Sequence, residues 1–386
     1  AGAMCNHRAR RCSDKIPSSL TTIWGYYVKF VIRAGGVGTR LWPYSRQSRP
    51  KQFHAMAGQN TMIQEAVDRL QPISGNDDIF VSTGSEMVEM VREQLPDLSD
   101  NQLIVEPALR NTGPAVGLEC ALLEGRFPGC VVASLGSDHY IGKPEEFCRL
   151  LNVAESAVDQ HPDCLVTIGV VPTRPETGYG YIRKGELLCK IDGQSVFCVP
   201  EFKEKPDEVI ARDYVSTGEY LWNSNMFVWK AATVLNLFRQ FEPEIYTVLE
   251  EIREAVVNGN CDHVVTSRYP GLPSVAIDNA IIERAPQVAT IEGDFNWGDI
   301  GTWAALTDVL PVDDKDNLLS GSIVAIDARN VTAFGMKEKL IALIGVDDLV
   351  VVDTADALLV CRKDQAQRVK EVLELIHNTK DYSRFT

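Results

Sequence analysis

The stretch VIRAGGVGTRLWPYSRQSRPKQF, residues 31–53, decides how the fold begins. An apolar run that starts at Val28 breaks into three glycines, and four cationic side chains follow. Glycines let the backbone approach a ligand and turn its N–H groups towards phosphate oxygens. The spacing is neither the GxGxxG of a dinucleotide site nor the GxxxxGK[ST] of a P-loop. The stretch therefore predicts a strand and an anion-binding loop, with a plain surface turn as the alternative.

The chain from this loop to residue 171 alternates short apolar runs with amphipathic segments. Such alternation is typical of an α/β fold, in which a parallel sheet is covered on both faces and binds ligands beyond the carboxyl ends of its strands. The helix at 61–70 begins with Thr61 and Gln64 at the spacing of a capping box. The predicted strands lie at 28–33, 79–83, 103–107, 130–135 and 164–171, and further helices lie near 85–95, 114–125 and 145–160.

The C-terminal part of the chain has a different rhythm. The polar segment PVDDKDN, residues 311–317, is interpreted as a linker, and short apolar runs without intervening helices follow it. They predict a small all-β unit, closed by an amphipathic helix at 364–376. We therefore divide the chain into a catalytic domain at 28–312 and a β domain at 313–386 that ends in a helix. Residues 1–27 are interpreted as an N-terminal extension or a vector-derived remnant.

Composition limits the classes of partner. The formal net charge of −15 over 386 residues argues against a general nucleic-acid binder or a protein of anionic membrane surfaces. An anionic ligand must therefore be held by a local cluster of cations. No apolar stretch is long enough to span a bilayer. Ten cysteines are scattered without a CxxC pair, which favours reduced thiols and a cytoplasmic location.

Eight motifs, in this order, resemble those of the sugar-nucleotide pyrophosphorylases, specifically the bacterial-type mannose-1-phosphate guanylyltransferases. The resemblance covers residues 28–375. The motifs are AGGVGTRLWPYSRQSRPKQF (34–53), EPALRNTGPA (106–115), SLGSDHYI (134–141), PTRPETGYGYI (172–182), FKEKPD (202–207), GEYLWNSNMF (218–227), SVAIDNAIIE (274–283) and GDFNWGDIGTW (293–303).

The resemblance implies a fold and a reaction. The fold would be a Rossmann-like nucleotidyltransferase domain with a mostly parallel mixed sheet, plus a small left-handed β-helix domain. The reaction would convert GTP and α-D-mannose 1-phosphate into GDP-mannose and pyrophosphate by Mg²⁺-assisted in-line attack. Because the attacking phosphate oxygen is already ionised near neutral pH, catalysis would rest on positioning and on charge stabilisation. A homodimer is also expected.

The resemblance assigns roles to individual residues. Asp138 and Asp299 match the aspartates that hold Mg²⁺, although a helix cap or a solvated loop would be the ordinary interpretation of either one. Arg40 and Lys51 match the cations that bind the triphosphate, and Lys205 matches the lysine that contacts the sugar phosphate. The expected nucleotide contacts are Gly35, Gly36, Gly38, Thr39, Asn111 and Thr112, and the expected sugar contacts are Gly178, Gly180, Glu204 and Asn223.

Some nearby residues receive structural interpretations instead. His139 adjoins Asp138 and is interpreted as a structural histidine rather than a metal ligand. Arg46 and Arg49 are interpreted as solvated surface charges. For Asn111 and Thr112, capping of the following helix is nearly as good an explanation as nucleotide contact.

The chain departs from the family pattern at four places. Arg33 stands where the family usually has leucine, and Val37 replaces a common serine. The pair Gly136-Ser137 replaces Pro-Ala, and Asn225 replaces a glycine. These departures leave the exact affinities and the base preference open.

Two other functions remain open at this point. One is a sugar-1-phosphate nucleotidyltransferase that uses a different base or sugar, since such pockets differ by a few contacts. The other is a catalytically silent regulatory subunit that binds a nucleotide sugar. The retained Asp138, Asp299, Arg40 and Lys51 argue against a silent subunit.

Overall fold

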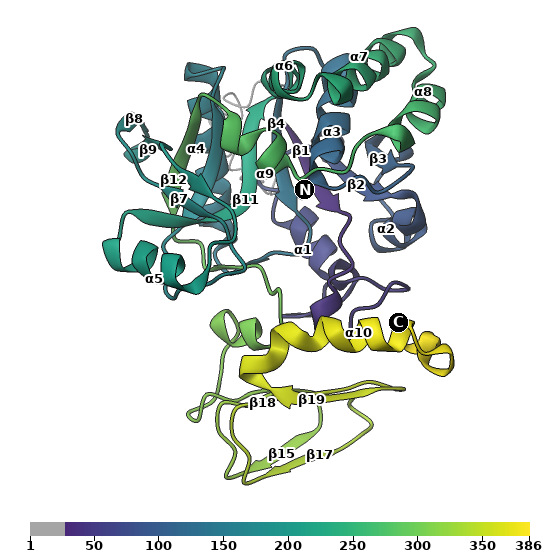
Figure 1. Ribbon diagram of the computed structural model, residues 1–386, viewed down its shortest axis with the longest axis vertical. Helices are drawn as coiled ribbons and strands as arrows, with labels where there is room; N and C mark the ends of the chain where they lie inside the picture. The colour runs from purple at the N-terminus through teal and green to yellow at the C-terminus, as the bar shows by residue number, and fades with distance from the viewer. Residues whose placement is uncertain (1–27) are drawn as a thin grey trace, which may run out of the picture.

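The computed structural model describes residues 28–386, which form a large α/β domain and a small β domain beneath it (Figure 1). The predicted N-terminal extension, residues 1–27, lies outside the described residues. Within the described part, no helix is both long and apolar enough to cross a membrane. The eight cysteines there are all free thiols, and four of them are buried.

An eleven-stranded mixed sheet forms the centre of the large domain, and every strand predicted up to residue 171 is confirmed. Its main path runs β3-β2-β1-β4-β11-β6-β12-β9-β8, with β7 pairing β11 and β10. The first four strands are parallel, whereas β11 runs antiparallel between β4 and β6. The strands are β1 (Val28–Ala34), β2 (Ile79–Gly84), β3 (Leu103–Glu106), β4 (Val131–Gly136), β6 (Leu165–Val170), β7 (Tyr181–Arg183), β8 (Leu187–Ile191), β9 (Gln194–Cys198), β10 (Phe202–Lys203), β11 (Tyr220–Lys230) and β12 (Val288–Gly293).

Helices cover both faces of this sheet, as the alternating pattern predicts, and each face has its own apolar core. The capping box is confirmed, because the backbone N–H of Thr61 donates to Gln64 Oε1 over 2.9 Å. One core includes residues of α1 (Met62–Asp68), α2 (Val88–Gln94), α4 (Pro144–Gln160) and α5 (Glu208–Thr217). The other includes residues of α3 (Thr112–Arg126), α6 (Ala231–Phe241), α7 (Pro243–Asn258), α8 (Cys261–Arg268) and α9 (Ile277–Ala280).

The β domain is a short solenoid. Successive coils stack their strands in parallel, β14-β16-β18 on one side and β15-β17 on the other, and β19 closes the first sheet antiparallel to β18. Gly321 has φ 108°, and a Cβ there would lie 2.2 Å from the carbonyl oxygen of Gly335, so the coils stack this closely only with glycine. The strands are β14 (Leu318–Ser320), β15 (Ile323–Ile326), β16 (Thr332–Phe334), β17 (Ile341–Ile344), β18 (Leu349–Asp353) and β19 (Leu358–Arg362).

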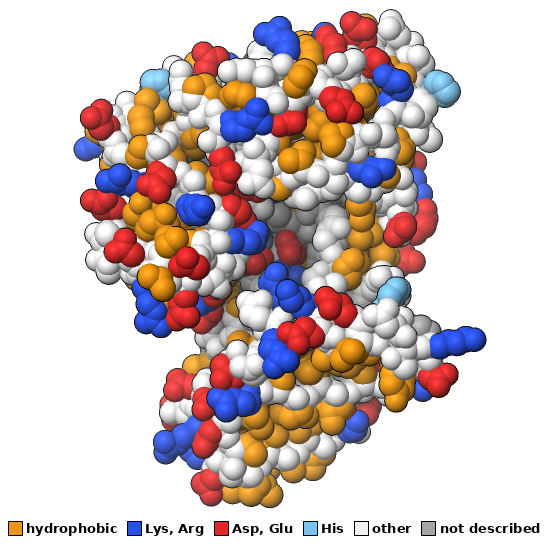
Figure 2. Space-filling model, viewed as in Figure 1, with side chains coloured by type: hydrophobic (Ala, Val, Ile, Leu, Met, Phe, Trp, Pro, Cys, Tyr) orange, Lys and Arg blue, Asp and Glu red, His pale blue; other side chains and the backbone are white. Residues whose placement is uncertain are grey.

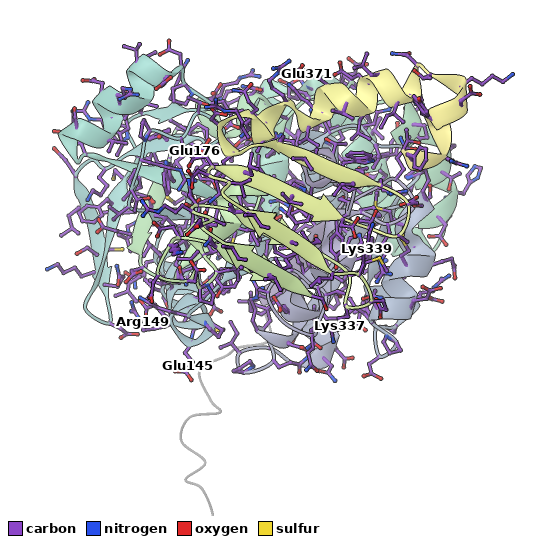
Figure 3. All side chains as sticks on the ribbon, turned by 90° about the horizontal axis from the view of Figure 1, so that it is seen from below. Glu145, Arg149, Glu176, Lys337, Lys339 and Glu371 are labelled. Carbon is purple, nitrogen blue, oxygen red and sulfur yellow. The ribbon has the colours of Figure 1, made fainter. Side chains whose placement is uncertain are left out.

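The closing helix begins later than predicted. Residues 363–368 wind as a 3₁₀-helix, η9, and the α-helix α10 covers Val369–His377. The apolar periodicity predicts one α-helix over 364–376. In the structure its first turn is the 3₁₀ segment instead, which buries Ala366. Seen from below, α10 with Glu371 runs along one side of the stacked strands, away from Lys337 and Lys339 (Figure 3).

A third apolar core joins the two domains and includes Leu41 and Trp42, which follow the glycine-rich loop. Trp42 and Trp303 from the large domain pack there with Val350 and Val352 of β18 and Val369 of α10. The indole N–H of Trp303 donates to the Trp42 carbonyl over 3.0 Å, and the indole N–H of Trp42 donates to the Phe385 carbonyl over 2.7 Å. The β domain therefore supports the segment that follows the loop.

The interpretation of Arg46 as a solvated surface charge is wrong. Its guanidinium is not a solvated surface charge, because both Nη atoms donate to the Asp356 carboxylate, over 2.8 and 2.6 Å. Asp356 belongs to the β domain, so the ion pair crosses the junction. The Arg46 hydrogen bonds hold the pKa of Asp356 below its ordinary value.

Candidate active site

The glycine-rich loop after β1 is shaped around Lys51. Gly38 has φ 74°, in the left-handed region that favours glycine. A Cβ on Gly38 would lie 2.6 Å from the Cβ of Lys51, so any side chain there would displace the lysine. The Lys51 backbone N–H donates to the Val37 carbonyl over 3.1 Å, and the Ser45 hydroxyl donates to the same carbonyl. The loop and Lys51 are thus held together by backbone contacts.

A two-stranded pairing brings the two predicted metal aspartates to the same place. Strand β5 (Tyr140–Ile141) follows Asp138, and β13 (Trp297–Gly298) precedes Asp299. The strands pair antiparallel, with Gly298 opposite Tyr140. Because the pairing is antiparallel, the segment just before β5, Asp138 and His139, and the residue after β13, Asp299, lie at the same end of the ladder. Residues far apart in the sequence thus meet beside the carboxyl end of β4.

Lys51 lies between these two carboxylates. Its Nζ is 2.8 Å from Asp138 Oδ2 and 3.7 Å from Asp299 Oδ1, and it also donates to the Asp299 backbone carbonyl. The lysine side chain is 3% exposed, while each carboxylate is about a third exposed. Burial acts to raise the pKa of Asp138, but the charges of Lys51 and His139 and the Lys51 hydrogen bond outweigh burial and lower it. The site therefore presents carboxylate oxygens at its surface and a cation beneath them.

Arg40 reaches the neighbourhood of Asp299 from the loop side. Measured from the position a Cβ would take on Gly301, Asp299 Oδ2 is 3.0 Å away and Arg40 Nη1 is 3.3 Å away. The Arg40 guanidinium and the Asp299 carboxylate thus both lie close to Gly301. With Arg40 and Lys51, the loop brings two cations to one metal candidate.

His139 is buried next to Asp138, with its ring edge-on to Trp297 at a centroid distance of 5.7 Å. Its Nε2 is 4.0 Å from Asp299 Oδ1. Burial lowers the pKa of His139 below its ordinary value, against the nearby carboxylates, which act to raise it. Its packing against Trp297 agrees with a structural role. Among the described residues, no group of three or more His, Cys, Asp and Glu side chains has metal-site geometry.

The predicted sugar contacts converge on the other side of β4. A Cβ on Gly180 would lie 2.5 Å from Glu204 Oε2 and 3.4 Å from the Cβ of Asn223, so the three positions touch. The Asn223 backbone N–H donates to the Gly180 carbonyl over 2.8 Å. The Asn223 side-chain oxygen already accepts from Thr167 and from the Asn225 N–H, which leaves its amide NH₂ for a ligand. Gly178 instead donates its N–H to Glu176 over 3.0 Å.

Lys205 and Asp278 complete this side. Lys205 has φ 46° and its Nζ contacts Glu204. Asp278 was not assigned from the sequence, although it lies in the motif SVAIDNAIIE. It is 8% exposed, and burial together with the Glu204 charge raises its pKa to about 6. The motif alone was the signal that could have identified it.

A cavity of about 380 Å³ extends from the glycine-rich loop to Asp138. Figure 2 shows a hollow at mid-face, between the large domain and the C-terminal helix, with basic and acidic side chains around it. The predicted residues that the cavity brings together are Gly35, Gly36, Asn111, Thr112 and Asp138. Sequence reasoning did not assign Ser82 and Glu106, which also line it. Burial raises the pKa of Glu106, whose Oε2 accepts from the Tyr269 hydroxyl over 2.7 Å.

Asn111 and Thr112 also cap α3. Asn111 has φ 68°, and its side chain accepts from the Thr112 N–H over 2.8 Å. The Thr112 hydroxyl accepts from the Ile277 N–H over 2.9 Å. Both residues therefore stabilise the local backbone and also line the cavity. Thr39 is less central, because it lines a separate cavity against α10.

Comparisons with known proteins agree with this architecture. The profile described as nucleotidyl transferase matches residues 29–315, and the MannoseP isomerase/GMP-like beta-helix domain matches residues 321–376. A mannose-1-phosphate guanylyltransferase of Salmonella muenchen is 37% identical over 352 residues, which is 90% of this chain and 72% of that protein. The Xanthan biosynthesis protein XanB of Xanthomonas campestris pv. campestris (strain ATCC 33913) is 37% identical over 354 residues, with the same coverages.

A solved structure matches both domains at once. It is described as a mannose-1-phosphate geranyltransferase from Thermus thermophilus, and it superimposes with a TM-score of 0.81 at 31% identity. The match covers 91% of this chain and 99% of that one.

Proposed function

The chain belongs to the mannose-1-phosphate guanylyltransferases of the nucleotidyl transferase family, and on this premise we propose that it converts GTP and α-D-mannose 1-phosphate into GDP-mannose and pyrophosphate. The observation that carries the proposal is Lys51, held between Asp138 and Asp299 beside the glycine-rich loop. This arrangement has cations for phosphates and free carboxylate oxygens, but no activated nucleophilic side chain.

The chemistry is one displacement at phosphorus. An oxygen of mannose 1-phosphate attacks the α-phosphorus of GTP, a P–O bond forms, and the bond to the β-phosphate oxygen breaks with its electron pair leaving on pyrophosphate. The attacking oxygen is already ionised, so no general base is required. Arg40 and Lys51 hold the triphosphate and stabilise the charge on the leaving group. The backbone N–H groups of Gly35 and Gly36 face the same phosphates.

The two aspartates fit a Mg²⁺ ion. Both offer hard carboxylate oxygens that are a third exposed, and both are close enough to share one cation, the Lys51 ammonium. When bound, the ion neutralises phosphate charge and orients the reacting oxygens. Asp138 and Asp299 would hold it, together with water and substrate oxygens.

The remaining assignments concern the sugar. Lys205 pairs with the sugar phosphate, and Glu204 accepts hydrogen bonds from sugar hydroxyls. The Asn223 amide donates to the same hydroxyls, and Gly180 lets the backbone close over the ring. The convergence of Gly180, Glu204 and Asn223 supports this assignment.

The proposal is tested by pyrophosphate release from purified protein with GTP, mannose 1-phosphate and Mg²⁺, with EDTA as the control. We expect metal-dependent release that drops when ATP replaces GTP, or when glucose 1-phosphate replaces mannose 1-phosphate. Equal release with every pair would keep the reaction class and remove the specificity. No release with any pair would overturn the proposal.

We further propose that the protein is a cytoplasmic homodimer. The free thiols of the described residues agree with a reducing compartment. The outer face of the β15–β17 sheet, defined by Val324, Ile326, Ala342 and Ile344, is apolar and exposed. Ile326 lies opposite Ile344 in the register, so the apolar side chains form one patch. Such a patch is typical of an interface, and a second copy of this chain is our proposed occupant.

A further inference from the structure

Three of the departures from the family pattern meet at one point in the structure. Arg33 on β1 is the register partner of Gly136 on β4. Arg33 Nη2 donates to the backbone carbonyl of Asn225 on β11 over 2.9 Å. All three residues line the cavity that also contains Gly35 and Asp138. Positions that are far apart in the sequence thus form a single contacting unit within the site.

The sheet order fixes the direction of the Arg33 side chain. It leaves β1, passes β4 at Gly136, and reaches β11. Register partners on adjacent strands point to the same face, so the missing side chain of Gly136 leaves this path open. A Cβ on Gly136 would also lie 2.8 Å from the His139 ring. Asn225 has φ 57°, a conformation that glycine adopts freely and asparagine tolerates better than most residues.

The hydrogen bond to Asn225 brings the guanidinium to β11, the strand that also carries the predicted sugar contact Asn223. Strand β11 carries Asn223, which lies against Gly180 and Glu204. The charge of Arg33 also acts to lower the pKa of Asp278, which the charges of Glu204 and Lys205 shift as well. Strands β2 and β3 lie on the opposite side of β1. They carry Ser82 and Glu106, which also line the cavity.

The guanidinium has spare hydrogen-bonding capacity. Its Nη1 is buried and has no hydrogen-bond partner in the part of the chain that the structure describes, and the same holds for Asn225 Oδ1. Its Nη2 bond goes to a neutral carbonyl. The charge of Arg33 acts to lower the pKa of three nearby groups. They are Glu119 on α3, Asp278 on α9 and His139 in the loop after β4. A planar cation with an unused donor is suited to a phosphate, which accepts two parallel N–H bonds.

We propose that Arg33 binds the phosphate group of the sugar 1-phosphate and so sets the affinity for that substrate. The inference rests on the proposed function. In this chain the phosphate is held by Lys205 from one side and by the Arg33 fork from the other. The proposed triphosphate cations keep their own places, Arg40 near Asp299 and Lys51 between Asp138 and Asp299, so Arg33 replaces neither of them.

The test compares initial rates of wild type, Arg33→Leu, which restores the residue usual in the family, and Arg33→Lys, which keeps the charge without the fork. Arg212→Leu, at an exposed arginine on α5, is the control for loss of a cation. We expect R33L to raise the KM for mannose 1-phosphate roughly tenfold to a hundredfold, as for loss of a charge-assisted pair, and to leave the KM for GTP within about threefold. R33K should recover part of the loss.

Two results would overturn the proposal. An equal rise in the KM for both substrates would place Arg33 on the nucleotide α-phosphate instead. A lower thermal midpoint with both KM values unchanged would make Arg33 a structural counter-ion of Glu119. If R33L does not fold, R33K decides, because loss of the fork should still raise the KM for mannose 1-phosphate about threefold or more.

Direct binding separates this proposal from the proposed reaction. Mannose 1-phosphate is titrated calorimetrically into each protein in the presence of GMP, which requires no turnover. If the wild type is inactive but binds mannose 1-phosphate about tenfold more tightly than R33L, the result would support the proposed role of Arg33 and overturn the proposed reaction. Equal affinities of wild type and R33L would overturn the role of Arg33, whether or not the protein is active.

Discussion

Lys51 Nζ lies 2.8 Å from Asp138 Oδ2, so the loop that should bind the triphosphate is tied directly to a candidate metal ligand. The same ammonium contacts Asp299, and both contacts depend on the close approach of Lys51 to Gly38. The Lys51 ammonium thus neutralises both carboxylates, which is also what the proposed Mg²⁺ ion would do.

Lys51→Met should therefore make stability depend on magnesium. Removing the ammonium leaves two carboxylates facing each other, and we expect a loss of about 1–3 kcal/mol, less than for a fully buried pair because the carboxylates are partly exposed. Urea unfolding in EDTA and in Mg²⁺ measures the effect, and Mg²⁺ should restore part of the loss. Lys143→Met, which removes the exposed pair with Asp294, is the control. Identical Mg²⁺ effects in wild type and K51M would contradict the prediction.

Asp138→Asn and Asp299→Asn should fold normally and lose most turnover. Each substitution keeps the shape and removes a charged oxygen ligand, so kcat should fall by at least about 10²-fold. Pyrophosphate release is measured over a Mg²⁺ titration, with the thermal midpoint as the check on folding. Asp294→Asn, at an aspartate near Asp299 that is 87% exposed, should keep wild-type rates. Wild-type turnover by either active-site variant would remove the metal assignment.

Glu119 should make the protein less stable as the pH rises. Burial raises the pKa of this fully buried carboxyl to about 7, against the opposing effects of Arg33 and of hydrogen bonds from Ser82 and Ser134. The folded state then holds a proton that the unfolded state releases above about pH 4.5, so stability falls between pH 4.5 and 7. Relative to wild type, Glu119→Gln should gain up to about 3 kcal/mol on going from pH 5 to pH 8. Unfolding free energies that stay parallel across this range would contradict the raised pKa.

The proposed dimer should depend on the outer face of the β15–β17 sheet. Ile326 is 52% exposed and Ile344 is 67% exposed, and they lie side by side. The double variant Ile326→Asp/Ile344→Asp places two charges in a contact that should be dry, so sedimentation equilibrium should give a monomer. Val209→Asp, at a valine on α5 that is 78% exposed, should leave the dimer intact. A wild-type monomer would rule the dimer out.

Much of the large domain could be predicted from local pattern. The period of apolar residues located β1 to β4 and the helices between them, because those elements bury a stripe or a face that the sequence shows directly. The position of β11 could not be predicted in this way. It inserts antiparallel between β4 and β6, and pairing across such sequence distances depends on the whole fold. Arg46 has the same explanation, since its partner Asp356 is 310 residues further along the chain.

The candidate site, too, could be predicted only in part from the sequence. Residue type and motif order predict Lys51, Asp138 and Asp299 as site residues, and the β5–β13 pairing brings the two aspartates together. The direction of Arg33 was not predictable, because it depends on Gly136 and Asn225 as neighbours. Asp278 was missed because its importance lies in burial next to Glu204, which one sequence does not display.

The hydrogen bond from Trp42 to the Phe385 carbonyl bears on how the protein opens locally. The N–H groups of Leu41 and Trp42 bond within the 3₁₀ turn Thr39–Leu41, and α10 packs against that turn. Detachment of the C-terminal segment would remove the cover from these amides. Their hydrogen exchange should therefore follow that of α10 rather than that of the strand β1 which precedes them, so that the loop and the last helix form one cooperative unit of the native state.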